Sequence, residues 1–506
     1  MKKYIFGLSI LSVFLSTACT DLSETVYSDL PSDKYFVSEK ALLMNAGRAY
    51  TKLQPYPEEQ MLWSLVTVST DECVVPARAD GEWWDNGRWD EMRQHAVLPT
   101  NKINRKAWEF VFGGITACNE VLYVTELSPY SFDGKDKILA EIKVLRALYY
   151  YWGMDAWGEI PFTTNFADKT LPKKKSRQFI FNFVEQEIKE NIKFLSETPT
   201  PLNYGRVTKG MAFTLLAKLY LNAQVWTGAP RWADAERMCD SVITKGNYRL
   251  ENNYFDNFKV QNENSKENIF VIVYNSTLTT ECFYWYDLTL NAMSRYTYNI
   301  NDTPWDGFMT TPDFFKTYTD TDLRKKTWLY GQQYHLNGKK LFEKSGTGDT
   351  LWFAYKADFP ESTYKSRHKW DGARCAKYEF QTNGLQYDII DMENDFVLFR
   401  YADVVMMKVE AMMRQSKTAQ ALSLPDFKLL RTRVGVSAFA TLTMDELLAE
   451  RGREFAWEGH RRQDLIRFNK WNDKWWAKPP TTTQWVFPIP QTAINTNPNL
   501  SQPAEN

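Results

Sequence analysis

The chain has 506 residues, with 61 basic and 62 acidic side chains and a formal net charge of −1. This balance disfavours a nucleic-acid-binding protein, and a chain of this length forms a core without disulfides or metal ions. A charged fraction of 24% and a mean hydropathy of −0.47 exclude a polytopic membrane protein and a disordered chain. Aromatic residues are abundant, with 19 Trp, 27 Tyr and 31 Phe. Because Trp and Tyr combine a flat apolar face with a polar group, they suit wet binding surfaces as well as cores.

The N-terminus predicts an exported protein. A short basic segment, 1–3, precedes a largely apolar segment, 4–15, which is shorter than the roughly 20 residues needed to cross a bilayer. The small residues before Cys19 resemble the cleavage site of a bacterial lipoprotein signal. We therefore expect a signal peptide over 1–18, lipidation at Cys19 and a polar tether over 19–30; an ordinary signal peptide that happens to contain a cysteine is the alternative.

The cysteine and histidine patterns predict neither a disulfide framework nor a metal site. Without Cys19 the number of cysteines is odd, there is no Cys-x-x-Cys pair, and the four histidines are scattered along the chain. We expect no cofactor. The remaining cysteines are Cys73, Cys118, Cys239, Cys282 and Cys375.

The body of the chain is predicted to be mostly α. Apolar residues recur at steps of three and four, the spacing of one helical face, and 208–245 is close to the period of a tetratricopeptide repeat. Thr443 and Glu446 have the spacing of a capping box, and Gly153, Gly158 and Pro161 are expected to end the first helix. The predicted helices are 136–152, 179–195, 208–226, 231–245, 401–414, 426–433 and 444–467.

These helices indicate tetratricopeptide-like hairpins that form a frame, with irregular loop-rich insertions and a few short strands. We expect a single domain over 31–506. Two stretches lack helical periodicity and are rich in Asn, Asp, Gly, Tyr and Trp, so they are the expected ligand region. The frame is predicted over about 31–70, 101–245 and 395–470, and the ligand region over about 70–100 and 246–394.

Several segments form an ordered set of motifs along the whole chain. The segments are Arg-Ala-Leu-Tyr-Tyr-Tyr-Trp at 146–152, Trp-Gly-Glu-Ile-Pro at 157–161, Gly-Arg-Val-Thr-Lys-Gly at 205–210, Phe-Arg-Tyr-Ala-Asp-Val at 399–404, the charged segment 450–467, Phe-Pro-Ile-Pro at 487–490 and the ending 495–502. Together with the lipoprotein-like N-terminus, this set resembles the SusD/RagB family of outer-membrane nutrient-binding lipoproteins of Bacteroidetes.

The resemblance implies a surface-exposed, lipid-anchored protein of the cell outer membrane. It would cover a SusC-like TonB-dependent transporter and hold oligosaccharides without cleaving them; capture of peptides is the alternative within the same family. The ligand region varies so much across the family that no single site motif carries over.

A Trp-rich segment is the first candidate for ligand contacts. It is too polar and too rich in glycine for a core helix, and it places three Trp within nine residues. Sugar rings stack on aromatic faces, while carboxylate, amide and guanidinium groups bind their hydroxyls. Packing alone is the competing interpretation. The candidates here are Trp83, Trp84, Asp85, Asn86, Arg88 and Trp89.

A second group of candidates lies in the longer insertion. Trp305, Asp306 and Gly307 resemble the family's Trp-Asn-Gly position ahead of a Thr-Pro-aromatic segment. Further candidates for ligand contacts are Tyr364, Trp370 and Arg374.

Two acidic features admit an enzymatic alternative. The segment 450–467 is interpreted as a structural ion-pair network in which Glu458 pairs with Arg461 and Arg462, and Asp464 with Arg461 and Arg467; an acid/base set around His460 is the alternative. Four carboxylates could in principle act in a helical glycoside hydrolase or lyase, namely those of Asp71, Glu72, Asp85 and Asp90. A helical scaffold without a small ligand is a third hypothesis.

Overall fold

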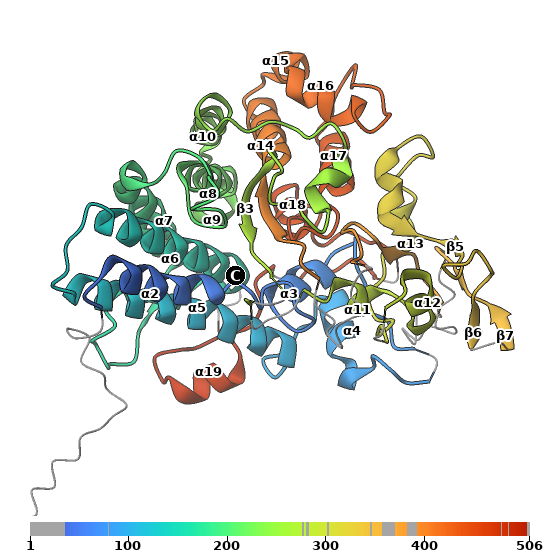
Figure 1. Cartoon of the computed structure of the whole chain (residues 1–506), viewed down its shortest axis with the longest axis horizontal. Helices are drawn as coiled ribbons and strands as arrows, with labels where there is room; N and C mark the ends of the chain where they lie inside the picture. The colour runs from blue at the N-terminus through green and yellow to red at the C-terminus, as the bar shows by residue number, and fades with distance from the viewer. Residues whose placement is uncertain are drawn as a thin grey trace, which may run out of the picture.

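The computed structural model describes residues 36–502, apart from 79, 276–277, 280–282, 301–302, 345–346, 357–369, 382–391, 477 and 484. The predicted signal peptide, the tether with Cys19, and Tyr364 therefore lie outside the described residues. The prediction of a mostly α fold with few short strands is confirmed (Figure 1). Within the described ranges, no helix combines the length and apolar composition needed to cross a membrane.

Helices that pack in pairs form the frame. α5 lies on α6, α6 on α7, α8 on α10 and α10 on α14, and they occupy the left and upper parts of Figure 1. The helices of the frame are α2 (Glu39–Thr51), α3 (Leu62–Val68), α5 (Lys102–Leu127), α6 (Lys135–Trp157), α7 (Arg177–Asn191), η2 (Ile192–Phe194), α8 (Lys209–Leu221), α9 (Ala223–Thr227), α10 (Trp232–Lys245), α14 (Tyr401–Arg414), α15 (Thr418–Ser423), α16 (Pro425–Thr432), α17 (Met444–Phe455), α18 (Arg461–Arg467) and α19 (Gln491–Thr496).

The loop-rich region contains short helices and strands, and most of its labelled elements lie in the right-hand half of Figure 1. Its helices are η1 (Asp85–Gly87), α4 (Arg88–Arg93), η3 (Tyr254–Phe258), α11 (Trp285–Thr289), η4 (Ala292–Ser294), α12 (Arg295–Tyr298), α13 (Pro312–Phe315) and η5 (Leu323–Thr327). The strands of the described chain are β1 (Ile160–Pro161), β2 (Lys174–Lys175), β3 (Asn268–Ile272), β4 (Trp328–Leu329), β5 (Gly331–Gln332), β6 (Phe342–Lys344), β7 (Thr347–Thr350), β8 (Trp352–Phe353), β9 (Arg374–Cys375) and β10 (Phe396–Arg400). They pair antiparallel as β1–β2, β3–β10, β4–β9, β5–β8 and β6–β7.

Helix α6 continues beyond Gly153, where the sequence predicts its end. The helix runs through Gly153 to Trp157 and ends before Gly158, which has a φ of 76°. A Cβ atom at Gly153 would lie 2.9 Å from the Ile160 side chain, so this glycine allows close packing inside a continuous helix. The predicted end at Gly153 is wrong because this glycine serves packing and not termination.

The predicted helix 444–467 is divided into α17 and α18. The capping box of Thr443 and Glu446 is confirmed at the start of α17. Between the two helices Trp457 has a φ of 60°, and its indole lies in the core, 1% exposed. The Trp457 Nε1–H donates to the Glu72 carbonyl at 2.9 Å, while the Trp457 carbonyl accepts from Trp63 Nε1 at 2.9 Å. The chain leaves the helix here because this indole bonds to a segment far away in sequence.

A buried cluster of ion pairs joins the frame to the loop-rich region. Arg400, at the end of β10, lies 2.7 Å from Glu267, 2.8 Å from Glu454 and 2.7 Å from Glu458. Burial alone would raise the pKa of Glu454, but three guanidinium groups, led by that of Arg433, hold it below its usual value. We call this set the central cluster: Arg324, Lys377, Arg400, Arg433, Glu267, Glu450, Glu454 and Glu458.

The ion pairs of α18 differ from the predicted pattern. Asp464 pairs with Arg467 at 2.7 Å as expected, but the predicted pairs of Glu458 with Arg461 and Arg462, and of Asp464 with Arg461, are wrong. For Glu458 the reason is the break before α18, because side chains three or four residues apart meet only on a continuous helix. Arg461 and Asp464 lie on the same helix, but each bonds to a different element, Arg461 to Asp71 and Asp464 to Arg451. The observed partners are Asp71 for Arg461, Asp155 for Arg462, Lys377 and Arg400 for Glu458, and Arg451 for Asp464.

We predict that Arg400→Met lowers the free energy of unfolding by roughly 3–5 kcal/mol, because it leaves buried carboxylates without their main counter-charge. Chemical denaturation monitored by circular dichroism measures the change. As a control, Arg105→Met removes the exposed ion pair of Arg105 with Glu109 and is expected to change the stability by less than about 1 kcal/mol. Equal effects of the two variants would contradict a special role for the central cluster.

Candidate functional site

The Trp-rich segment folds into a turn with left-handed backbone, which we call the Trp84 turn (residues 83–89). The φ angles are 61° at Trp83, 46° at Asp85, 58° at Asn86 and 79° at Gly87. Non-glycine residues adopt this conformation at a cost of the order of 1 kcal/mol each, so contacts elsewhere must maintain it. Those contacts come from the two indoles beside Trp84.

Trp83 attaches this turn to a second loop, residues 303–308, which we call the Trp305 loop. The Trp83 Nε1–H donates to the Trp305 carbonyl at 2.7 Å, and the ring lies against Gly307, where a Cβ atom would be only 2.4 Å away. Its ring centroid lies 5.8 Å from that of Phe308. Trp83 is thus half-buried between the loops, with part of its surface still accessible.

Trp89 supports the turn from its buried side. Its ring is 1% exposed and lies 5.3 Å from the ring of Phe308, and its Nε1–H donates to Asp85 Oδ2 at 2.7 Å. The Trp89 ring therefore has almost no surface to offer a ligand in this conformation, and its predicted ligand contact stays a prediction. The segment is a turn that buries one of its three indoles.

Trp84 is the indole that the turn presents to solvent, 50% exposed. Asn86 beside it is exposed, while Asp85 and Arg88 are partly buried. Arg88 Nε–H donates to the Asp85 carbonyl at 2.8 Å, so these two side chains also hold the backbone of the turn. The accessible surface therefore combines a flat aromatic face with amide, carboxylate and guanidinium groups.

In the Trp305 loop the aromatic residue is accessible and the acidic one is not. The Trp305 ring is half-buried, with its centroid 5.2 Å from that of Tyr284. Asp306 is 3% exposed, has a φ of 61°, and accepts hydrogen bonds from Arg374 Nη2 at 2.6 Å and Asn291 Nδ2 at 3.2 Å. The predicted ligand contact of Asp306 stays a prediction, and in this structure its carboxylate fixes the loop from inside.

Arg374 and Trp370 also lie behind the accessible surface. Arg374 is fully buried, and burial lowers the pKa of its guanidinium to about 9 although Asp306 opposes this shift. The predicted ligand contact of Arg374 likewise stays a prediction, and in this structure its side chain has no accessible surface. Trp370 is half-buried and packs on a small apolar cluster that contains Leu351 and Phe353.

Sequence reasoning missed Arg78, which fixes the Trp305 loop and also binds the segment at Asp371. Its fully buried guanidinium donates from Nε to the Asp306 carbonyl at 2.8 Å, from Nη2 to the Gly307 carbonyl at 2.9 Å and from Nη1 to the Asp371 carbonyl at 3.3 Å. The available signal was a basic residue directly after the apolar run 74–77. Nothing in the spacing reveals that its partners are carbonyls more than 200 residues away.

The four carboxylates considered for catalysis have structural partners or are buried. Asp71 forms two bonds of 2.7 Å with Arg461, and Asp90 lies 2.7 Å from Arg93 Nε. Glu72 is fully buried, and burial raises its pKa to about 8, while Asp85 holds the Trp89 indole. This arrangement does not place two accessible carboxylates across a cleft.

His460 is equally unsuited to surface acid/base chemistry. It is 6% exposed and its Nδ1 lies 3.1 Å from Lys218 Nζ, and burial together with that lysine holds the imidazole pKa well below its usual value. A neutral histidine beside a buried ammonium group is best explained as part of the packing around α8.

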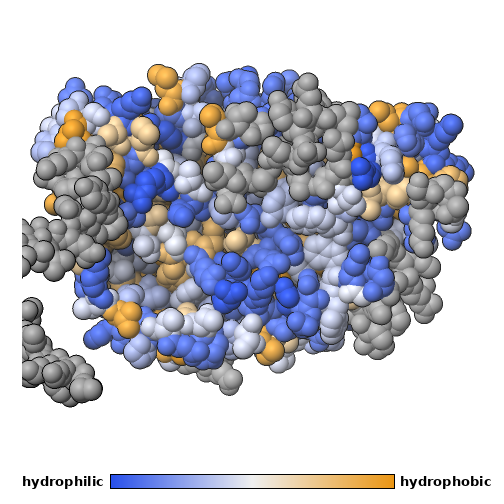
Figure 2. All heavy atoms as spheres, turned by 60° about the horizontal axis from the view of Figure 1, so that its bottom comes forward, coloured by the Kyte–Doolittle hydropathy of each residue, from blue (hydrophilic) through white to orange (hydrophobic). Residues whose placement is uncertain are grey.

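Two hollows on the frame do not include the accessible indoles. One of about 420 Å³ lies between the loops 198–206 and 246–249 and strand β3. The other, of about 770 Å³, lies between α5 and the segment around α19. Figure 2 brings the lower side of Figure 1 forward and shows hydrophobic residues recessed between hydrophilic ones on this side of the molecule. Within the described residues, no group of three or more His, Cys, Asp and Glu side chains could hold a metal ion.

Comparison with known proteins settles the family. A family model described as "SusD family" matches residues 240–505, more than half of the chain, and one described as "Starch-binding associating with outer membrane" matches residues 22–221. The chain belongs to the SusD family. Starch-binding protein SusD of Bacteroides thetaiotaomicron is 26% identical over 477 residues, which cover 86% of this chain and 83% of that protein.

Solved structures share the fold of this SusD-family protein. The surface glycan-binding protein A of Bacteroides thetaiotaomicron in complex with laminarihexaose superposes with a TM-score of 0.72 at 20% identity, covering 92% of this chain and 99% of that chain. A laminarin-binding SusD-like protein gives 0.73 at 19% identity, covering 93% and 100%. At these identities the similarity establishes the fold.

We predict that Gly307→Ala displaces the Trp83 ring and lowers the free energy of unfolding by roughly 1–3 kcal/mol, because the added methyl group would overlap that ring. Intrinsic tryptophan fluorescence and denaturant unfolding report the change. Gly113→Ala is the matched control, since nothing lies within 4 Å of its Cβ position on α5 and alanine favours a helix. An unchanged emission spectrum for Gly307→Ala would contradict the packing described.

Proposed function

We propose that this protein binds oligosaccharides at the outer surface of the cell, through the Trp84 turn and the Trp305 loop. The main observation behind this proposal is Trp84, an indole half exposed to solvent on a turn that two other indoles hold in place. Membership of the SusD family and the relatives named for binding starch, laminarin or glycans support carbohydrate as the ligand class.

The arrangement suits weak, reversible capture. At about 25 cal/mol per Å² of apolar surface, one stacked sugar ring contributes of the order of 1–2 kcal/mol. Since the turn and loop are already fixed by hydrogen bonds, little ordering is needed when a ligand binds. Trp84, Trp83 and Trp305 provide accessible aromatic surface, and Asn86, Asp85 and Arg88 provide polar groups for hydroxyls.

We propose a binding protein and not an enzyme. The carboxylates near the Trp84 turn hold the fold: Asp85 binds the Trp89 indole and Asp71 binds Arg461. A glycoside hydrolase requires two accessible carboxyl groups on opposite sides of the scissile bond. Delivery of the captured glycan to a SusC-like TonB-dependent transporter completes the proposal.

We predict that Trp84→Ala weakens oligosaccharide binding by about five- to thirtyfold, the equivalent of one lost stacking contact. Isothermal titration calorimetry with laminarin-derived and starch-derived oligosaccharides measures the affinity. The matched control is Phe194→Ala, which removes an aromatic ring of similar exposure from η2 on the frame.

Four results would contradict the proposed function. Unchanged affinity in Trp84→Ala would remove the turn from the site. Sustained release of reducing sugar from laminarin or starch would favour a hydrolase, and binding of peptides in place of glycans would favour peptide capture. The absence of any ligand effect would leave a helical scaffold.

We predict that Cys19→Ala releases the protein from the membrane fraction, because the proposed lipid anchor is attached to this thiol. Fractionation of cells expressing the full chain, followed by immunoblotting, measures the distribution. Cys73→Ala is the control, since Cys73 is a buried thiol within the fold. Membrane retention of Cys19→Ala would contradict lipid anchoring.

A further inference from the structure

A second aromatic surface lies on the ribbon formed by β5 and β8. The two strands pair with Gly331 opposite Phe353 and Gln332 opposite Trp352. Because opposite residues share a face and successive residues alternate, Trp352 lies on the same face as Gln332. Continuing the alternation places Tyr334 on this face too, while the exposed Tyr330 lies beside the ribbon before Gly331, whose φ of 79° interrupts the alternation. We call Tyr330, Tyr334 and Trp352 the ribbon face.

The ribbon face is exposed although the ribbon has a core of its own. Trp352 is 54% exposed, Tyr334 48% and Tyr330 45%. On the opposite face, Leu351 and Phe353 are fully buried in a small apolar cluster. A shift of one residue would exchange the two faces, so this packing fixes which side chains point outward. The exposed rings are therefore held on a rigid support.

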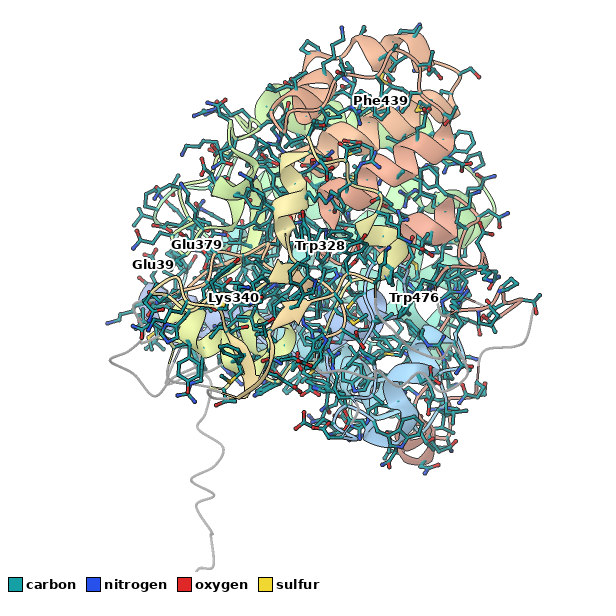
Figure 3. All side chains as sticks on the ribbon, turned by 90° about the vertical axis from the view of Figure 1, so that its right-hand side faces the viewer. Glu39, Trp328, Lys340, Glu379, Phe439 and Trp476 are labelled. Atoms are coloured by element: carbon teal, nitrogen blue, oxygen red, sulfur yellow. The ribbon has the colours of Figure 1, made fainter. Side chains whose placement is uncertain are left out.

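The ribbon is connected to the Trp305 loop through α12. On one side of this helix, Thr297 Oγ1 donates to the Tyr334 carbonyl at 2.7 Å, and the Leu336 amide donates to the Tyr296 carbonyl at 3.0 Å. On the other side, Arg295 Nη1 lies 3.1 Å from Thr303 Oγ1. In Figure 1 α12 lies between α11 and the strands β5 to β7, and Figure 3 turns this side toward the viewer.

The buried Arg78 provides a second connection. Its guanidinium binds the carbonyls of the Trp305 loop and also the carbonyl of Asp371. Asp371 forms a β-bridge with Ala354, the residue that follows β8. The Trp305 loop and the ribbon thus belong to one hydrogen-bonded unit, with no flexible linker required between their aromatic surfaces.

We propose that the ribbon face is a second contact surface for the same glycan, so that a long chain is held at both the Trp84 turn and the ribbon while a short oligosaccharide occupies only one of them. This inference rests on the proposed function. The ligand class follows from the continuity of the ribbon with the Trp305 loop and from its flat Tyr and Trp rings. Once one end of a chain is bound, the second contact is intramolecular and strengthens binding without a change at the first.

The test compares Trp352→Ala with wild type on ligands of two lengths. The probes are laminarin with laminaritriose, and amylopectin with maltotriose, measured by calorimetry for the trisaccharides and by affinity electrophoresis for the polysaccharides. We expect Trp352→Ala to lose affinity for the bound polysaccharide on the order of tenfold and to bind its trisaccharide as wild type does. Trp352→Phe should retain most of the affinity because it keeps an aromatic face.

The controls separate this inference from the proposed function. Trp84→Ala should weaken binding of both lengths, and Phe194→Ala neither. If wild type binds no glycan, the proposed function and this inference both fail. If wild type and Trp84→Ala behave as expected but Trp352→Ala binds the polysaccharide like wild type, only the second surface is refuted; a ribbon face that serves a protein partner would give that result. Circular dichroism checks that each variant is folded.

Discussion

The fold depends on the neutralisation of charge in its interior. The central cluster brings acidic side chains from α17 and the start of β3 against basic side chains from β10, the end of α16 and the loop-rich region. Removing these groups from water is costly, and only mutual pairing compensates for that cost. Because the partners come from both parts of the chain, the frame and the loop-rich region can reach low energy only together.

That coupling explains how irregular loops can carry a defined surface. The Trp84 turn is strained at several positions, and its shape is maintained by hydrogen bonds from two indoles and by the Trp305 loop. The same segment therefore contains one ring for contact and two for support. Aromatic content alone does not separate these roles, since hydrogen bonding of the indole N–H groups decides which ring remains free.

The sequence predicted the helical frame well, because apolar periodicity and capping residues are local signals. Helix α14 has the predicted bounds, and the Thr443 capping box marks the start of α17. Predictions that depend on contacts between residues far apart in sequence were less accurate. Trp457 interrupts the predicted continuous helix, and Asp306 and Arg374 bind each other inside the protein. At the candidate site, the sequence indicated a Trp-rich, non-helical segment but could not distinguish exposed Trp84 from buried Trp89.

Arg78 fixes the Trp305 loop and the segment at Asp371 through main-chain carbonyls and not through side chains. Every amino acid carries the same carbonyl group, so these three bonds do not depend on the side chains of their partners, although Trp83 and Arg374 constrain Gly307 and Asp306. The rings and polar groups that contact a ligand can then change during evolution while the backbone beneath them keeps its conformation. A scaffold of this kind is suited to diversification among nutrients, because recognition and architecture are encoded by different atoms of the same residues.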